Sequence, residues 1–162
     1  MLPLTPREYV GIYPHMAGVE SPDFAGCLVG NLRAAARVAT RVYDSALRET
    51  GVRITQVAIL AQVRKFQPVT ISELAAELAG ERSAVARDLA ILERSGLVST
   101  AVKADDRRAR QIRLTPEGER RLLDCAPLWR NAQNAMADAF GPERVRDLVE
   151  LTNELVATVG AI

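Results

Sequence analysis

Three short helices are predicted in close succession in the middle third of this 162-residue chain. Apolar residues recur at helical spacing over residues 56–66 and again over residues 83–95. Between them lies a shorter helical segment that Thr70 or Ser72 can cap and that Gly80 ends. Short helices are stable only when they bury their apolar faces against neighbours. This succession therefore constrains the fold more than any other feature of the sequence.

A β-hairpin is predicted directly after these helices. Residues 97–102 and 110–114 flank the polar stretch 103–109, and the second flank alternates polar and apolar residues as a half-buried strand does. The order helix, turn, helix, hairpin is that of a winged helix-turn-helix. In that motif the second helix of the pair enters the major groove of DNA, and arginines of the hairpin reach the minor groove or the phosphates.

Positive charge is concentrated in the same segment. Residues 81–113 hold eight basic and five acidic residues, whereas the rest of the chain holds 13 basic and 15 acidic residues. A module that binds a polyanion needs such a concentration of positive charge. We therefore expect contacts with duplex DNA from this segment.

Residues 71–119 resemble the MarR-type (multiple antibiotic resistance) regulators in five motifs. The resemblance extends, with the flanking helices, over about residues 24–160. The five matches are Leu74-Ala75 in the bracing helix, Arg87 in the recognition helix, Leu92-Glu93-x-x-Gly96-Leu97-Val98, Asp106-Arg107-Arg108 at the hairpin tip, and Leu114-Thr115-x-x-Gly118 after it.

The resemblance implies a DNA-binding transcriptional regulator without enzymatic activity, expected to be a repressor, with activation as the alternative. It implies a homodimer joined by helices from both ends of the chain, a palindromic operator, and release by a small phenolic or aromatic acid or by oxidation. The expected fold is mainly α (α+β), a single MarR-type domain. Its expected parts are an arm at 1–22, dimerisation helices within 23–54 and 116–162, and the winged helix-turn-helix at 55–115. Capping residues and apolar spacing predict a helix from Ser21 to about Glu49, and Thr115-Pro116 predicts the start of another.

The expected DNA contacts come from the recognition helix and the hairpin. Two departures from the family are Ala84 and Ala86, where serine or threonine is common, so that fewer hydroxyl groups are available for phosphate or base contacts. By resemblance, Asp106 orients Arg108 toward the minor groove. The candidate residues are Arg82, Ser83, Arg87, Asp106, Arg107, Arg108 and Arg110.

The candidate effector residues lie on the two long helices that flank this segment. The structural alternative is favoured for each of them, and Trp129 in particular is typical of a core position. They are Arg37, Tyr43, Trp129 and Gln133.

The two cysteines are far apart and form no Cys-x-x-Cys motif, which argues against a disulfide framework or a cysteine metal site. Peroxide-sensing relatives carry a reactive cysteine near the position of Cys27, so a thiol sensor is an alternative reading. No basic residue lies within a turn of Cys27 to lower its pKa, which favours a small packed residue instead. Cys125 is expected to pack between helices.

Other function classes find little support in the sequence. No nucleophile–base pair, phosphate loop or metal cluster is evident, and the single histidine, His15, makes a poor metal site, so no cofactor or metal is expected. No run of about 18 apolar residues predicts a membrane span, and the N-terminus lacks an apolar signal stretch, which together favour the cytoplasm. A winged helix that binds proteins and no longer binds DNA is the remaining alternative.

Overall fold

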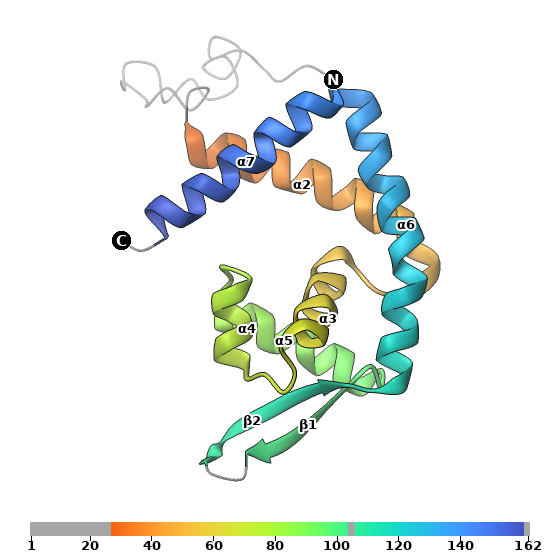
Figure 1. Ribbon diagram of the computed structural model, residues 1–162, viewed down its shortest axis with the longest axis vertical. Coiled ribbons are helices and arrows are strands. Elements are labelled where there is room, and N and C mark those ends of the chain that lie inside the picture. Colours follow the sequence, from red (N-terminus) through yellow and green to blue (C-terminus); the bar gives the residue numbers. More distant parts are fainter. Residues whose placement is uncertain (1–26, 104–105, 161–162) are drawn as a thin grey trace, which may run out of the picture. The chain divides into compact units, whose positions relative to one another are not determined.

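The computed structural model describes residues 27–103 and 106–160, in which the helices and strands follow the expected order (Figure 1). The chain divides into two units, Met1–Thr40 and Arg41–Ile162, and the boundary falls within the first described helix. The expected arm at residues 1–22 and the expected helix start near Ser21 lie outside the described residues.

Helix α2 spans Leu28–Ala46. Its first turn is closed by Asn31, whose backbone and side-chain N–H groups both donate to the carbonyl of Cys27. The helix was expected to continue to about residue 49, but it ends earlier, in a 3-10 turn, η3, at Arg48–Thr50. The tighter turn lets the chain reverse at Gly51, whose φ of +71° suits glycine.

Three helices form the predicted central group: α3 at Ile54–Phe66, α4 at Ile71–Glu77 and α5 at Arg82–Arg94. The cap of α4 is Thr70 rather than Ser72. The backbone N–H of Glu73 donates to Thr70 Oγ1 at 3.3 Å, and the Thr70 N–H donates to Glu73 Oε2 at 2.7 Å. This reciprocal capping box satisfies two donors that the first turn of a helix leaves without partners.

The hairpin that follows pairs β1 at Val98–Lys103 with β2 at Asp106–Leu114, antiparallel. Residues 106–109, predicted as part of a polar tip, belong to β2. The register of the pairing shifts between Val102 and Lys103, so that Lys103 pairs with Asp106 while Val102 pairs with Arg110. At its other edge β2 forms a bridge from Ile112 to Val69.

Two long helices complete the chain: α6 at Pro116–Phe140 and α7 at Pro142–Val159. Thr115 caps α6 by accepting a hydrogen bond from the Gly118 N–H at 3.0 Å, and Pro116 occupies the first turn as predicted. Helix α7 packs against α6. No described helix has both the length and the apolar character that a bilayer crossing requires.

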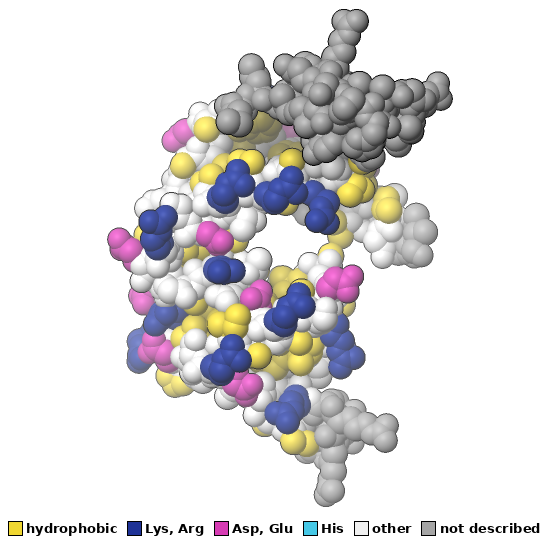
Figure 2. Space-filling view, turned by 180° about the vertical axis from the view of Figure 1, so that it is seen from behind, with side chains coloured by type: hydrophobic (Ala, Val, Ile, Leu, Met, Phe, Trp, Pro, Cys, Tyr) yellow, Lys and Arg dark blue, Asp and Glu magenta, His cyan; other side chains and the backbone are white. Residues whose placement is uncertain are grey.

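The hydrophobic core lies among α3, α4, α5, the hairpin and α6, and neither α2 nor α7 contributes a buried residue to it. Hydrophobic side chains also reach the surface, among charges of both signs (Figure 2). Those on α7 are Leu148, Val149, Leu151, Val156 and Val159, each between 45% and 63% exposed. The largest fully buried side chains are Leu47, Ile59, Leu60, Leu74, Leu92, Leu97, Ile112, Val63 and Cys125.

Candidate functional site

Helix α5 presents one buried and one exposed face. Val85, Leu89 and Leu92 are buried in the core, and this anchors the helix against α3 and α4. Of the predicted recognition residues, Arg82, Ser83 and Arg87 are all exposed. In the part of the chain that the structure describes, neither arginine forms an ion pair. Both guanidinium groups are therefore available to an anionic partner.

The exposed face of α5 extends further than the sequence interpretation recognised. Ala90, Ile91 and Arg94 are exposed as well, and they follow Arg87 by three, four and seven residues. Residues at these spacings share one face of a helix. The spacing from Arg87 was a signal that could have identified them before the structure was known.

Hydrogen bonds connect α5 to the hairpin. The hydroxyl of Thr100, on β1, donates to the carboxylate of Glu93, in the last turn of α5. Just beyond that helix, the Thr115 hydroxyl donates to the carbonyl of Gly96 at 2.6 Å. These bonds fix the orientation of the hairpin relative to the exposed face of α5.

The root of the hairpin is also bonded to the segment between α3 and α4. The backbone N–H of Leu114 donates to Gln67 Oε1 at 2.9 Å, and Val69 and Ile112 exchange two backbone hydrogen bonds at 2.8 and 3.2 Å. Farther out on β2, Arg110 is exposed opposite Val102. Asp106, Arg107 and Arg108 lie on β2, but their side chains are outside the described part of the structure.

Three of the four candidate effector residues come together between the last turn of α2 and α6. The hydroxyl of Tyr43 donates to Gln133 Oε1, and the rings of Tyr43 and Trp129 have centroids 6.4 Å apart. Burial raises the pKa of the Tyr43 phenol, so it remains a protonated donor. The fourth residue, Arg37, is exposed on the part of α2 that belongs to the first unit.

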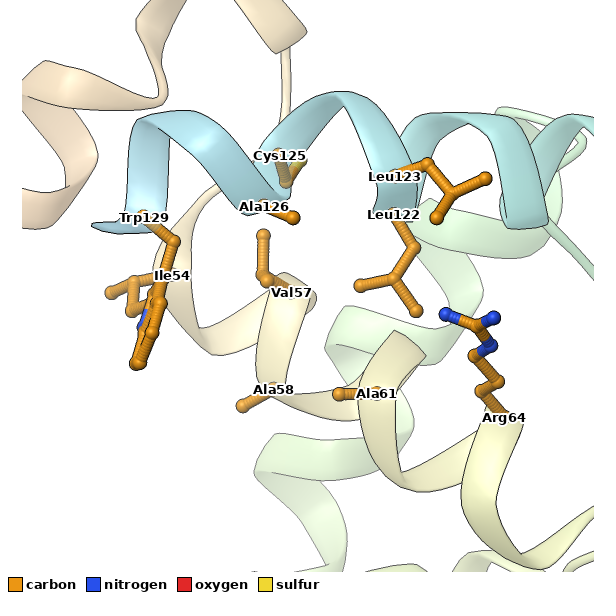
Figure 3. A pocket seen from close by; sticks show the side chains of 10 residues that line it. All are labelled: Ile54, Val57, Ala58, Ala61, Arg64, Leu122, Leu123, Cys125, Ala126 and Trp129. Atoms are coloured by element: carbon orange, nitrogen blue, oxygen red, sulfur yellow. The ribbon is translucent and has the colours of Figure 1, made fainter. Parts of the chain in front are cut away.

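Trp129 is 41% exposed, so the expectation of a core position was wrong; it lines a groove of about 430 Å³ between α3 and α6 (Figure 3). Its walls are apolar: Val57, Ala58 and Ala61 come from α3, and Leu122, Ala126 and Trp129 come from α6. The one charged group in the lining is Arg64, which pairs with Glu119 at 3.3 Å. The groove therefore suits a mostly apolar molecule. Its own charged group, Arg64, is already paired with Glu119.

The two cysteines lie in different surroundings. Cys125 is fully buried in the core, as predicted, and burial raises the pKa of its thiol. Cys27 is half-buried at the start of α2. The thiolate is the reactive form of cysteine, so Cys125 is poorly suited to redox chemistry. Among the described residues, no group of three or more His, Cys, Asp and Glu could hold a metal ion.

Comparison with known families and structures supports this arrangement. The profile of the winged helix DNA-binding domain matches residues 52–118. The transcriptional regulator MosR of M. tuberculosis, solved in complex with DNA, is 36% identical; the match covers 81% of this chain and 97% of that one, with a TM-score of 0.69. A search of curated protein sequences gave no match.

Two further solved structures show the same fold at lower identity. MarR of E. coli, in its apo form, is 20% identical with a TM-score of 0.65, and the match covers 80% of this chain and 96% of that one. PcaV of Streptomyces coelicolor, in complex with its natural ligand, is 16% identical with a TM-score of 0.75, and the match covers 86% of this chain and 98% of that one.

Proposed function

Since the chain belongs to the MarR family of winged-helix transcriptional regulators, we propose that it binds a palindromic operator as a homodimer and represses transcription. The observation that carries this proposal is the exposed face of α5, where Arg87 stands opposite a buried apolar stripe. A helix held in this way can enter the major groove while its buried face stays in the core. MosR, the 36% identical relative, was solved with DNA bound.

In this proposal the parts of the chain have separate roles. Residues 55–115 bind DNA, with Arg82, Ser83 and Arg87 in the major groove. Asp106, Arg107, Arg108 and Arg110 serve the flanking minor groove and phosphates. The helices within 23–54 and 116–162 join two copies of the chain. Two-fold pairing then sets the two recognition helices about one DNA turn apart.

Exposed apolar residues support the proposed dimer. On α7, Leu151 is 63% exposed and Val156 is 55% exposed, and on α2, Val29 is 63% exposed. Soluble proteins seldom leave such side chains in water over a whole helix face. A second copy of the chain would bury them, and a two-fold axis would give a palindromic site one recognition helix for each half.

Binding to duplex DNA is tested by a salt titration. Fluorescence anisotropy with a duplex that the parent protein selects from a random library should give a Kd that rises steeply with salt, because phosphate contacts release counterions. If Arg108 meets a phosphate, Arg108→Ala should weaken binding and lower the slope of log Kd against log salt concentration by about one. A parent protein that selects no duplex, or whose binding does not depend on salt, would instead favour a module that binds proteins.

We propose further that a small aromatic effector releases the operator by binding beside Trp129. The groove has the size of a small-molecule site, and its apolar walls suit an aromatic ring. Tyr43 is hydrogen-bonded to Gln133 and its ring lies beside that of Trp129, so polar groups are close to the tryptophan. Arg37, which belongs to the first unit, is proposed separately as a residue that pairs with an acidic ligand.

The chain's single tryptophan makes the effector site testable. Hydroxybenzoic acids should change Trp129 fluorescence saturably, at the same concentrations that release the operator. Ala58→Leu should weaken both effects by filling the groove without adding charge. Release of DNA with unchanged Trp129 fluorescence would place the effector elsewhere.

A further inference from the structure

Ile91 is a large apolar side chain on the exposed face of the recognition helix. It is 41% exposed, while the other large aliphatic residues of α5, Val85, Leu89 and Leu92, are at most 5% exposed. It lies four residues after Arg87 and three before Arg94, so both arginines are its neighbours on the helix surface. An isoleucine flanked in this way leaves apolar area in water between two charged groups.

Base edges in the major groove offer such a side chain one apolar group. Adenine, guanine and cytosine present hydrogen-bond donors and acceptors there, whereas thymine adds its C5-methyl group. We propose that Ile91 is a specificity-determining residue that packs against a thymine methyl in each half of the operator. This inference rests on the proposed function, because it requires α5 to lie in the major groove.

The helix geometry gives the expected position of that thymine. Four residues of α-helix advance about 6 Å, which is at most roughly two base-pair steps of about 3.4 Å each along the DNA axis. Arg87 is suited to a bidentate contact with guanine. Each half-site should therefore hold a thymine within about two base pairs of the pair that Arg87 reads, on the side toward the C-terminal end of α5.

Replacement of thymine by deoxyuridine tests the contact, because it removes the C5-methyl group and leaves base pairing intact. The probe is the duplex that the parent protein selects from a random library, with deoxyuridine placed at one thymine of each half-site in turn. For the parent, one such position should raise Kd by about three- to tenfold, which is the scale of one or two buried methyl-sized groups. This rise in Kd is the deoxyuridine penalty. Ile91→Ala should bind the unmodified duplex about as weakly as the parent binds the deoxyuridine duplex, and it should show no deoxyuridine penalty at that position.

Two variants complete the experiment. Ile91→Val keeps part of the apolar surface and should retain an intermediate penalty. Leu123→Ala removes an exposed apolar side chain from α6, outside residues 55–115, and should retain the full penalty. Because Ile91 and Leu123 are exposed, none of these changes should alter the thermal unfolding midpoint by more than a few degrees.

The outcomes separate this inference from the function on which it rests. A parent protein that binds its operator equally well with thymine or deoxyuridine at every position would overturn the role of Ile91 and leave the proposed function intact. An Ile91→Ala variant that keeps the parental deoxyuridine penalty would do the same. A parent that selects no duplex would overturn both.

Discussion

The backbone N–H of Ile54, at the start of α3, donates a hydrogen bond to Asp44 Oδ1 at 2.8 Å. Asp44 lies in the last turn of α2, ten residues earlier, so this bond connects the flanking helix to the first helix of the winged domain. Arg53, the residue before the helix, has its own N–H satisfied by Gln56 Oε1 at 3.0 Å. The carboxylate of Asp44 thus supplies both an acceptor and a negative charge at a helix N-terminus.

Asp44→Ala should therefore lower the free energy of unfolding by about 1 kcal/mol, in the range of a lost N-terminal cap. Asp44→Asn keeps an acceptor and loses the charge, so it should cost less. Urea unfolding at one fixed protein concentration measures the difference as a change in midpoint at constant slope. If both variants unfold at the parental midpoint, the bond contributes nothing to stability.

Gly118 is required by a close approach between α6 and the residue before the hairpin. A Cβ atom at this position would lie 2.0 Å from the carbonyl oxygen of Leu97. Gly118→Ala should force α6 away from Leu97 and lower the free energy of unfolding by about 3 kcal/mol or more. Thermal unfolding should show a much lower midpoint.

Gly96 provides the matched control for that substitution. It has a φ of +70°, and nothing lies within 4 Å of a Cβ placed on it. Gly96→Ala should therefore cost only the left-handed backbone conformation, about 1–2 kcal/mol. Equal losses in the two variants would show that the contact with Leu97 does not explain the glycine at position 118.

Arg87→Ala should weaken operator binding by about 1–3 kcal/mol and relax specificity at one position of each half-site. The reason is the exposed position of Arg87 on α5, where a guanidinium group can reach base edges. Arg130→Ala, which removes an exposed arginine from α6, serves as the control and should bind as the parent does. The Kd values of the parent and of each variant for all single-base changes of the selected duplex show at which positions specificity is lost. A uniform loss over every sequence would identify Arg87 as a phosphate contact instead.

Cys125 should resist thiol reagents in the native protein. It is fully buried, and burial raises the pKa of its thiol, so at neutral pH the thiolate is scarcer than for a free cysteine. In a Cys27→Ser background, labelling by iodoacetamide should be slow in buffer and complete in urea. Rapid labelling in buffer would show that the helices around Cys125 open readily.

The Cys27→Ser change also serves as a test of the thiol-sensor alternative. We expect operator binding by this variant to equal that of the parent, with or without peroxide. Peroxide-induced release by the parent that disappears in the variant would establish Cys27 as a sensor.

Deletion of the residues after Gly141 should abolish dimerisation and operator binding together. Helix α7 contributes no residue to the core, so the winged domain should stay folded without it. Light scattering reports the mass, circular dichroism reports the helical content, and anisotropy reports binding to the selected duplex. A truncated monomer that binds the full operator with parental affinity would contradict the proposed dimer.

Local patterns were sufficient for most of the fold. The order of the helices, the hairpin and the Thr115-Pro116 start of α6 follow from apolar spacing, capping residues and turn residues, which act over a few neighbouring positions. Arg87 was identified by its match to the recognition-helix motif of the family, within a helix that local spacing predicted. The errors were also local: α2 ends earlier than expected, and residues 106–109 belong to β2.

Contacts between distant parts of the chain were decided by packing. Tyr43 and Gln133 are 90 positions apart, and Gln67 and Leu114 are 47 positions apart, yet each pair shares a hydrogen bond. The groove between α3 and α6 likewise depends on how two helices lie against each other. A sequence pattern shows which face of each helix is apolar, but the partner that covers it is chosen only when all the elements compete for the same core. The sequence by itself therefore determined the helices, the hairpin and the exposed arginine of α5, whereas the tertiary structure decided what lies beside Tyr43, Gln67 and Trp129.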